Sequence, residues 1–529
     1  MGQGPAVTRG PHAVQLTRRA LLGAAGLPLL GCGRPPEVTG ALGGAHPERG
    51  HLLRETRAWP APVDAGRVRV LVAGGGVAGL AAARGLRQRG IEDFALLELE
   101  DVPGGNSRPG AVAGIACPLG AHYLPLPGDD AREVQQFLEE LGLRRRVAGR
   151  WTYDERHLCH APQERLFFNG QWQEGLLPLQ GVGAATLGQY RRFAVRVDEA
   201  GRAARFTIPA PRTPAPSHRM LDALTFAQWL QREGLDDERL RWYLDYCCRD
   251  DYGAGIEQVS AWAGIHYFAS RHGFQPPGAE AGEREAVLTW PEGNGWLVRR
   301  LAAGLGERLR TGRVVIRIAE QRHGVEVDAW NAATQAVERW QAQHCIVALP
   351  MFVAARVVEN PPPLLRQRAQ QARYAPWAVA NLHLREPLRD RGGAAPAWDN
   401  VLYGAAGLGY VDARHQGLDP RPGPTVLSCY RAPGPAQRAQ VLARSWADWR
   451  QEVVAELAAP HPDLAGKLSR IEVARYGHAM VIPVPGTLGQ VASGVPQTAR
   501  LAFAHSDWAG YSIFEEAFTA GHRAGAAAG

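Results

Sequence analysis

The sequence has very little lysine: Lys467 is the single lysine, and arginine supplies all the other permanently cationic side chains. This scarcity excludes most lysine-based chemistry. Arginine is scattered, and its densest run, residues 144–146, has only three members. No compact basic patch interleaved with aromatic residues is present, so we expect no nucleic-acid partner. The net charge of +7 therefore bears on solubility and on weak attraction to anionic surfaces.

Cysteine is also scarce, with seven residues in 529. No CxxC pair occurs and no cysteine and histidine share a metal-ligand spacing, so we expect no metal site. Apart from Cys32, six cysteines do not make a disulfide scaffold in a chain of this length, although an oxidising compartment leaves room for one long-range disulfide. Beyond residue 30 no apolar run approaches the roughly 20 residues that a spanning helix needs.

The composition itself is ordinary for a folded protein. Apolar residues make up 45% and charged residues 21% of the chain, close to the globular average. With 62 glycines and 39 prolines the chain is rich in loops but not of low complexity. These values exclude a collagen-like chain, a long coiled coil and a mostly disordered protein. The length predicts two to four domains of about 150 residues each.

Residues 1–32 resemble an export leader. Arg18 and Arg19 form a twin-arginine pair that precedes a short, weakly apolar stretch. Cys32 ends a Leu-Leu-Gly-Cys sequence similar to a lipobox, in which the cysteine is lipidated. We expect export to the periplasm or cell surface, with a lipid anchor at Cys32 as the only membrane contact; the alternative is a cytosolic extension that contains two arginines by chance. Residues 33–65, rich in Gly, Pro, Glu and Arg, are expected to be a flexible tether.

The clearest chemical signal follows this tether. Residues 67–73 have the pattern of a buried strand, a glycine-rich turn comes next, and an Ala-rich helical stretch follows. In the turn, Gly74 permits the tight bend, Gly76 lets the backbone approach a pyrophosphate, and Gly79 lets helix and strand pack closely. Glu98 ends the second strand, 19 residues after the last of these glycines, and can accept a hydrogen bond from a ribose hydroxyl. The spacing predicts a dinucleotide site.

The residues after Glu98 resemble one particular family. Gly104 and Gly105 complete an E-x5-GG pattern similar to that of the FAD-dependent amine oxidase superfamily, which includes phytoene-desaturase-like and protoporphyrinogen-oxidase-like enzymes. Nicotinamide dehydrogenases lack this glycine pair. Further segments similar to the family's motifs occur in the expected order, at residues 120–123, 290–297, 344–350, 503–511 and 515–521.

The resemblance implies a set of cofactor contacts. FAD is the expected cofactor, with Arg108 in place of an arginine that many members carry just after the glycine pair. Val314 begins a cofactor-contacting strand, and Asp507 takes the ribityl-binding position if the closing motif is shifted by one residue. Many amine oxidases place a lysine near flavin N5, but Lys467 is on an apparently exposed helix. Because no cysteine follows Cys429, we expect the flavin to be non-covalent.

The middle of the chain is expected to face the substrate. Residues 130–147 have the apolar spacing of a helix, Thr225 begins a capping box, and residues 260–271 have the pattern of another helix. The segment 246–253 is dense in polar and aromatic groups. It either contributes to the substrate pocket or is a helix end whose carboxylates pair with Arg249.

The resemblance implies an oxidoreductase that removes a hydride from a small amine and passes it to flavin N5, with oxygen or another molecule as final acceptor. Tyr511, in a segment similar to the family's WSGY, is expected to form one wall of an aromatic cage, and His478 is expected to lie in the pocket. Two alternatives remain open. One is a desaturase or dehydrogenase of a lipophilic substrate, and the other is a non-catalytic exported flavoprotein.

The expected fold class is α/β, with an FAD-binding Rossmann-like domain interleaved with an α+β substrate domain. The resemblance extends over residues 66–529 and is weakest between about 150 and 285. The FAD-binding domain is predicted from residues 66–150, 285–350 and 490–529, and the substrate domain from residues 151–284 and 351–489.

Overall fold

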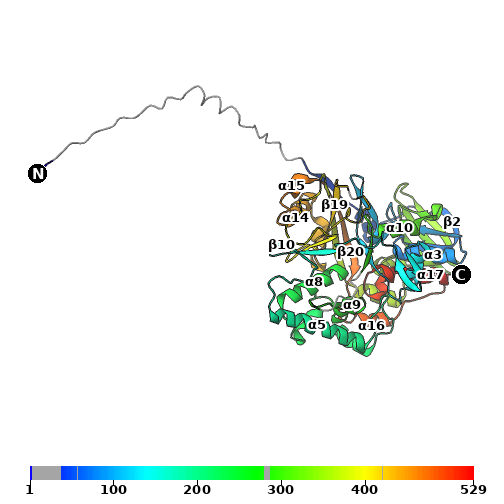
Figure 1. The fold of residues 1–529 in the computed structure, drawn as a ribbon. Coiled ribbons are helices and arrows are strands. Elements are labelled where there is room, and N and C mark those ends of the chain that lie inside the picture. The colour runs from blue at the N-terminus through cyan, green and yellow to red at the C-terminus, as the bar shows by residue number, and fades with distance from the viewer. Residues whose placement is uncertain (3–36, 56, 279–285, 420, 529) are drawn as a thin grey trace, which may run out of the picture. The chain divides into compact units, whose positions relative to one another are not determined.

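The computed structural model describes residues 1–2, 37–55, 57–278, 286–419 and 421–528 (Figure 1). The predicted leader, including Arg18, Arg19 and Cys32, lies outside these residues. Residues 38–529 form one compact unit. Within the described part, no helix is long and apolar enough to cross a membrane, and the six described cysteines are free thiols.

One sheet of this unit has seven strands and carries the dinucleotide motif. Parallel pairing joins five of its strands, and an antiparallel meander completes it. The parallel strands are β12 (Leu309–Arg310), β3 (Phe94–Leu97), β2 (Val63–Ala73), β15 (Val337–Val347) and β21 (Leu501–Phe503), and the meander adds β14 (Gly324–Asn331) and β13 (Arg313–Gln321). Strand β2 is buried on both faces because Val70 and Val72 pack on one side while Leu71 and Ala73 pack on the other.

Two helices rich in small residues cover one face of this sheet. Helix α3 (Val77–Gln88) follows β2, and α17 (Phe514–Ala527) comes from the C-terminal end of the chain. Their backbones nearly touch, since a Cβ atom at Gly521 would lie 1.8 Å from the carbonyl oxygen of Ala78. Further helices of this half are α4 (Arg132–Glu140), α10 (Gly295–Ala302), α11 (Met351–Val357) and α12 (Pro363–Gln371). The close approach explains why the terminal helix is rich in Gly and Ala.

A second sheet, of eight strands, forms the other half. Its order is β1 (Thr39–Gly43), β20 (Leu468–Val481), β16 (Tyr374–Leu384), β19 (Thr425–Arg431), β18 (Tyr410–Asp412), β17 (Asp399–Leu402), β9 (Glu164–Phe168) and β10 (Gln171–Glu174). One face packs on α13 (Arg438–Ala443), α14 (Trp446–Ala458) and α15 (Leu464–Lys467). Along β16, Ala378 and Ala380 face this layer, whereas Trp377 and Val379 face the opposite side.

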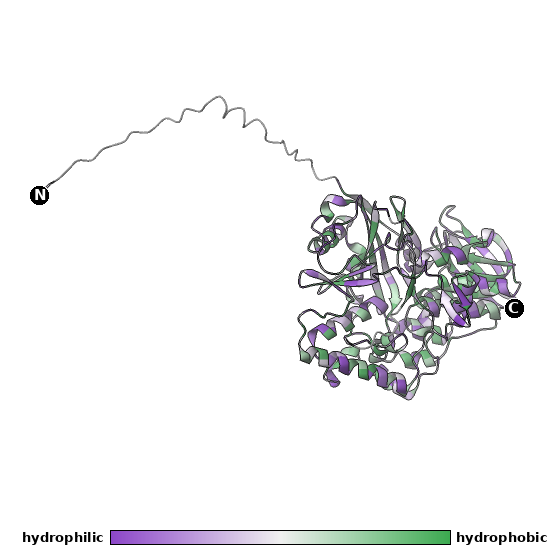
Figure 2. Cartoon of the chain, viewed as in Figure 1, coloured by the Kyte–Doolittle hydropathy of each residue, from purple (hydrophilic) through white to green (hydrophobic). Residues whose placement is uncertain are grey.

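A layer of helices lies on that opposite side. Its members are α5 (Ala184–Ala203), α6 (Pro216–Asp222), α7 (Phe226–Arg232), α8 (Glu238–Tyr252), α9 (Ala261–Ala269) and α16 (Thr487–Ala492). Hydrophilic and hydrophobic residues alternate along α5 in Figure 2, and its inward face carries Tyr190, Phe193 and Val197. The predicted capping box at Thr225 is present, and Ser260 caps α9 as its position before the apolar run predicts. Three two-stranded antiparallel pairs complete the fold. Two are hairpins, β4 (Pro109–Val112) with β5 (Ile115–Pro118) and β7 (Arg144–Val147) with β8 (Arg150–Tyr153), and the third joins the distant strands β6 (Tyr123–Pro125) and β11 (Val287–Thr289).

Two sequence-based expectations about local structure are wrong. The helix expected over 130–147 is α4 alone, since Gly142 takes a left-handed conformation and the chain then turns into the β7–β8 hairpin. The tether expected over 33–65 is ordered from residue 38, because β1 pairs with β20, α2 (Pro47–His51) follows, and β2 begins at Val63. The sequence could not predict β1, because the alternation of apolar and polar residues in one short strand is too brief to be recognised in a segment rich in Gly and Pro. The predicted domain boundaries stay a prediction.

Candidate active site

A cavity of about 950 Å³ runs through this unit, at the upper end of the range for ligand sites. It lies where the parallel strands of the seven-stranded sheet end. Residues that follow β2, β3, β15 and β21 all line it, among them Gly76, Glu98, Pro350 and Ser506. Ligands of open α/β sheets bind outside these carboxyl ends. The eight-stranded sheet and the helices α8 and α17 supply further parts of the wall.

Bare backbone forms the first part of the wall. Gly74 has φ +104°, and a Cβ atom there would lie 2.4 Å from the carbonyl oxygen of Ala348. A Cβ atom at Gly79 would lie 1.8 Å from the oxygen of Gly74, so the helix packs directly on the turn. Gly76 is the N-cap of α3 and leaves open space before it. The geometry agrees with the turn predicted at Gly74 and the close packing predicted at Gly79, and the approach of Gly76 to a pyrophosphate stays a prediction.

The glycine pair Gly104–Gly105 lies beside the glycine turn that follows β2. Gly104 forms an isolated bridge with Gly76, and its N–H donates to the oxygen of Gly75 at 2.8 Å. Gly104 and Gly105 have φ values of +126° and +56°, which favour glycine. Two turns without side chains thus lie side by side at the N-terminus of α3, an arrangement suited to a diphosphate.

Glu98 is buried beside these turns. Its two carboxylate oxygens accept hydrogen bonds from the N–H groups of Gly75 at 2.7 Å and Glu100 at 2.8 Å. Burial raises the pKa of Glu98 to about 6, although both N–H groups oppose the shift. Arg108 lies against the same segment, 3.2 Å from the Glu100 carboxylate, and its Nε donates to the oxygen of Gly105. Both residues line the cavity, as does Val314 on β13.

Asp507 also lines the cavity, but its carboxylate is engaged by the protein. It accepts hydrogen bonds from the N–H of Met351 at 3.0 Å and from the Tyr374 hydroxyl at 2.6 Å, and His505 lies 3.1 Å away. Burial alone would raise the pKa of Asp507, but His505, Tyr374 and Met351 outweigh it, so the pKa lies below its ordinary value. Ser506 lines the cavity next to it. The ribityl-binding role of Asp507 stays a prediction.

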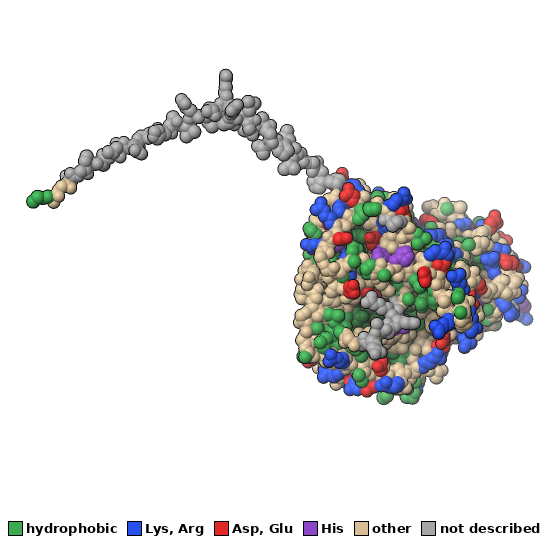
Figure 3. Space-filling model, in the orientation of Figure 1, with side chains coloured by type: hydrophobic (Ala, Val, Ile, Leu, Met, Phe, Trp, Pro, Cys, Tyr) green, Lys and Arg blue, Asp and Glu red, His purple; other side chains and the backbone are tan. Residues whose placement is uncertain are grey.

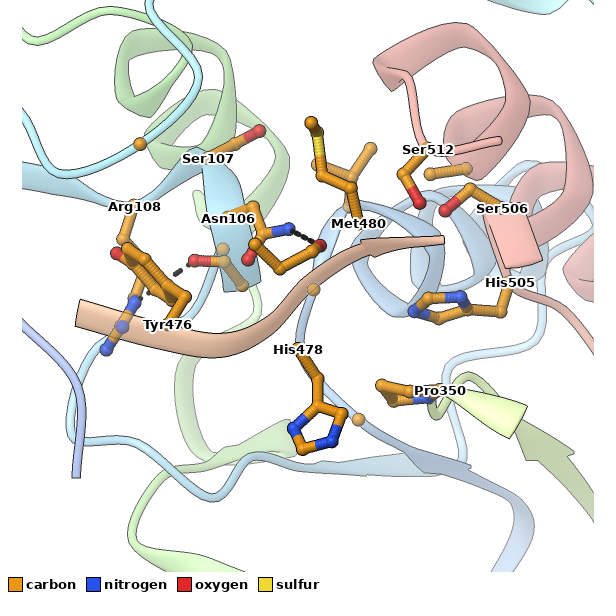
Figure 4. Close-up of a pocket in the computed structure, with 18 of the residues that line it drawn as sticks. Asn106, Ser107, Arg108, Pro350, Tyr476, His478, Met480, His505, Ser506 and Ser512 are labelled. Carbon is orange, nitrogen blue, oxygen red and sulfur yellow. Dashed lines mark hydrogen bonds between the residues drawn. The ribbon is translucent and has the colours of Figure 1, made fainter. Parts of the chain in front are cut away.

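Strand β20 crosses the cavity and carries His478. Figure 4 shows Asn106 reaching to this strand, where its amide donates to the oxygen of Ala479. The His478 ring lies 4.6 Å from that of Phe352. Burial, together with nearby Arg438 and Arg54, lowers the pKa of His478 to about 4, so the ring is neutral at physiological pH. His478 therefore lies in the cavity, and its catalytic role stays a prediction.

Of two further family positions, one agrees with expectation and one does not. Lys467 pairs with Asp463 at 2.8 Å and does not line the cavity, in agreement with the sequence analysis. Tyr511 does not line the cavity either, and its predicted place in an aromatic cage is wrong. Its ring is 1% exposed, packs against Trp262, and donates through its hydroxyl to Glu516 at 2.9 Å. The two residues between Tyr511 and α17, Ser512 and Ile513, line the cavity instead.

Tyrosine and tryptophan rings line the cavity at several points, and apart from the first they lie outside the motifs that the sequence analysis named. They are Tyr123, Tyr374, Trp377, Tyr430 and Tyr476. His122 stacks on Tyr430 with ring centroids 4.3 Å apart, and the Tyr430 hydroxyl donates to the oxygen of Gly120. A strongly apolar strand, β16, supplies two of the five, and only its aromatic content could have suggested them.

Charged side chains meet at one end of the cavity, beside Tyr123. Asp250 and Asp251 come from the last turn of α8, Arg271 follows α9, and Glu515 begins α17; all four line the cavity. Asp251 accepts two hydrogen bonds from Arg271 at 3.1 Å, and Asp250 lies 3.5 Å from the Tyr123 hydroxyl. The sequence analysis left open whether this segment faces the pocket. It does, while the partner of Arg249 is Asp245.

Two of these carboxyls hold their protons unusually tightly. Burial, followed by the charge of Asp251, raises the pKa of Asp250 to about 7. Burial likewise raises the pKa of Glu515 to about 7, and Arg271 lowers the pKa of both groups. Since Arg271 is already paired with Asp251, this end of the cavity carries more potential negative than positive charge. An added cation would stabilise the ionised carboxylates.

The cavity thus defines a class of protein. Paired bare turns, a helix N-terminus and a buried carboxylate, all at the carboxyl edge of a parallel sheet, fit a dinucleotide. The glycine cradle leaves space that a Cβ atom would fill, and Glu98 lies beside it. Gly74, Gly76, Gly104, Gly105 and Glu98 would hold FAD, which supplies hydride-accepting chemistry when bound.

Comparison with known proteins gives the same result. The family described as flavin containing amine oxidoreductase matches residues 77–528, and the chain belongs to it. L-amino acid dehydrogenase of Synechocystis sp. is 28% identical over 247 residues, covering 46% of this chain and 48% of that protein. The alignment therefore spans about half the length of this relative.

Solved structures share the fold. Wild-type putrescine oxidase bound to putrescine matches with a TM-score of 0.67 and 19% identity, covering 87% of this chain and 98% of that one. Cyclohexylamine oxidase from Brevibacterium oxydans matches with a TM-score of 0.64 and 18% identity over similar shares. The predicted fold class, an FAD-binding Rossmann-like domain with a substrate domain, is confirmed, and FAD is the cofactor of the family.

Proposed function

We propose that the protein is an FAD-dependent oxidoreductase that removes a hydride from a small cationic amine. One observation carries this proposal: the acidic end of the cavity, where Asp250 and Glu515 lie beside an Asp251–Arg271 pair that already neutralises itself. A protonated amine supplies the counter-charge that two buried carboxyls lack. Family membership and the named oxidase neighbours support the reaction type.

The lining also suits an amine rather than an amino acid. A substrate carboxylate requires a cationic partner, but Asp251 holds Arg271 through two hydrogen bonds. Displacing one carboxylate by another gains little, whereas a cation meets Asp250 and Glu515 directly. The rings of Tyr430 and Trp377 add π faces for a positive group and exclude water from the carbon that loses the hydride.

The test is the visible spectrum of the purified holoprotein under anaerobic conditions. We expect a primary amine to bleach the flavin band and an L-amino acid to leave it unchanged. Bleaching by amino acids alone would overturn the substrate assignment. A response only to a lipophilic substrate with an oxidisable C–C bond would instead support the desaturase alternative.

We also propose that the flavin is non-covalent. No cysteine lines the cavity in the described part of the chain, so the family's cysteine attachment has no candidate there. Denaturation in acid should release all the yellow chromophore into the supernatant, and the precipitated protein should be colourless. Flavin that remains with the precipitate would identify a covalent bond.

We further propose that the protein is exported through the leader in residues 1–32 and anchored by a lipid at Cys32. The twin-arginine pair and the following Leu-Leu-Gly-Cys sequence support this. Replacing Arg18 and Arg19 with Lys should retain the protein in the cytoplasm. Cys32→Ser should move it from the membrane fraction to the soluble fraction, and unchanged fractionation in both variants would refute the leader.

A further inference from the structure

Residues 38–54, here named the strap, join the fold ahead of the dinucleotide motif and outside the range of the family match, which begins at residue 77. The strap contains β1, α2 and a 3₁₀ turn at Leu52–Arg54. In Figure 1 it is the dark blue segment that enters beside the eight-stranded sheet. Family membership therefore does not account for it.

One end of the strap is fixed to the eight-stranded sheet. Strand β1 pairs in parallel with β20, from Thr39 opposite Arg470 to Gly43 opposite Ala474. The approach is close, because a Cβ atom at Gly40 would lie 1.8 Å from the oxygen of Ile471. Gly40 has φ +154°, so a side chain there is disfavoured by the backbone as well. This ladder is specific for glycine.

The other end is fixed to the seven-stranded sheet. The Glu100 carboxylate accepts hydrogen bonds from the His46 N–H at 3.0 Å and lies 2.6 Å from its ring Nδ1. Arg49 donates to Asp101 at 2.8 Å and to the oxygen of Leu99 at 2.9 Å. These acceptors directly follow Glu98, and Glu100 also pairs with Arg108. The strap thus contacts the same segment that would hold the cofactor.

After β1 the strap runs along the cavity. Seven of its residues line it: Ala45, His46, Pro47, Gly50, His51, Leu53 and Arg54. Glu100, the partner of His46, lines the cavity beside the strap, and so do Arg108 and His478. Figure 3 shows histidine side chains gathered on this hollowed face of the molecule. A molecule bound along the glycine cradle therefore has the strap on its open side.

The geometry points to a strap that retains FAD: the cofactor leaves only after residues 38–54 separate from β20 and from the Leu99–Asp101 segment. His46 and Arg49 are positioning residues for the cofactor, acting through Glu100 and Asp101. The strap therefore slows the release of FAD, as a covalent bond to the flavin would, and it adds no contact to the reacting atoms.

The test measures release of FAD from the holoprotein into excess apoflavoprotein trap, with no substrate present. Arg49→Ala removes the contacts with Asp101 and Leu99, and we expect release about tenfold faster, equivalent to about 1.4 kcal/mol. Arg49→Lys should restore part of the difference. The matched control is Arg421→Ala, which removes an exposed pair with Asp419 that does not line the cavity and should leave the rate unchanged.

A second variant opens the strap from its other end. Gly40→Val lies outside the cavity lining and should increase both FAD release and hydrogen exchange at the β1 amides. Gly466→Val, where a side chain meets open space, is its control. Faster exchange in β1 with an unchanged rate of FAD release would overturn the proposal, as would flavin that no variant releases. Because no amine is used, either result leaves the proposed reaction untouched.

Discussion

The two ends of the cavity are built in different ways. The cofactor end consists of backbone, with Gly74, Gly76, Gly104 and Gly105 leaving space and helix α3 presenting its N–H groups. The substrate end consists of side chains brought from α8, from the segment after α9 and from α17. The first recognises a constant ligand by shape and dipole, and the second recognises a variable one by charge.

The difference has a consequence for substitution. At the cofactor end a side chain at Gly74 would collide with the backbone of Ala348, and side chains at Gly76 or Gly105 would fill the space left for the cofactor. The substrate end has ionisable groups whose neighbours adjust their charge, so a change there alters affinity and pH dependence while the fold persists. Changes at the cofactor end should therefore alter stability or FAD affinity, and changes at the substrate end should alter the affinity for a cation and its pH dependence.

The largest effect is expected behind the cofactor end, at Gly521→Val. A Cβ atom there would lie 1.8 Å from the Ala78 oxygen, so α17 must move away from α3. We expect the free energy of unfolding to fall by about 3 kcal/mol or more, measured by denaturant titration. Gly201→Val, on an open face of α5, should stay within about 0.5 kcal/mol of the wild type. Similar stability in both variants would contradict the close packing of the two helices.

The next effect is on cofactor affinity, at Glu98→Ala. Hydrogen bonds to a charged group contribute about 1.5–3 kcal/mol, so FAD should bind about ten- to a hundredfold more weakly. Titration of the apoprotein with FAD gives the dissociation constant. Glu98→Gln keeps one oxygen as acceptor and should lose less. Full flavin occupancy with unchanged affinity in Glu98→Ala would remove the ribose role.

A smaller effect is expected at the substrate end, on binding of a quaternary ammonium ion whose charge does not titrate. Burial raises the pKa of Asp250 and Glu515 to about 7. These groups are protonated below that pH and ionise above it, so cation affinity should rise as pH rises, by about tenfold per group from about pH 6 to 8.

The control for this pH dependence is the pair of isosteric variants Asp250→Asn and Glu515→Gln. Each should flatten the dependence by removing one titrating group, while the visible spectrum of bound FAD stays the same. The shift of the flavin band on adding the ammonium ion reports binding. An affinity independent of pH in the wild type would show that these carboxyls do not meet the cation.

The smallest effect is expected at Tyr511→Phe. The hydroxyl donates to Glu516, which also accepts from the Ala210 N–H, so the variant loses one hydrogen bond worth about 1 kcal/mol. Turnover should be unchanged, since the ring does not line the cavity. Loss of turnover with normal stability would return Tyr511 to the active site.

Sequence reasoning succeeded where the signal is local. Gly74, Gly79 and Glu98 could be assigned because a strand, a tight turn and a helix follow one another within about thirty residues, and the backbone geometry of such a unit hardly depends on the rest of the chain. The helix starts at Thr225 and Ser260 were predictable for the same reason, since a capping side chain bonds to N–H groups three residues away.

Sequence reasoning was wrong or silent where partners are distant. Tyr511 has the right motif around it, but its ring packs into the core against Trp262 instead of lining the cavity. The strap could not be predicted from the sequence because β1 pairs with β20, which lies more than 400 residues later in the chain. Thus the sequence alone determined which cofactor the chain binds, because the glycine turn and Glu98 belong to one local unit of strand, turn and helix. Only the tertiary structure decided what surrounds that cofactor, because Asp250, Arg271, Glu515 and the strap meet through packing between elements that no short pattern connects.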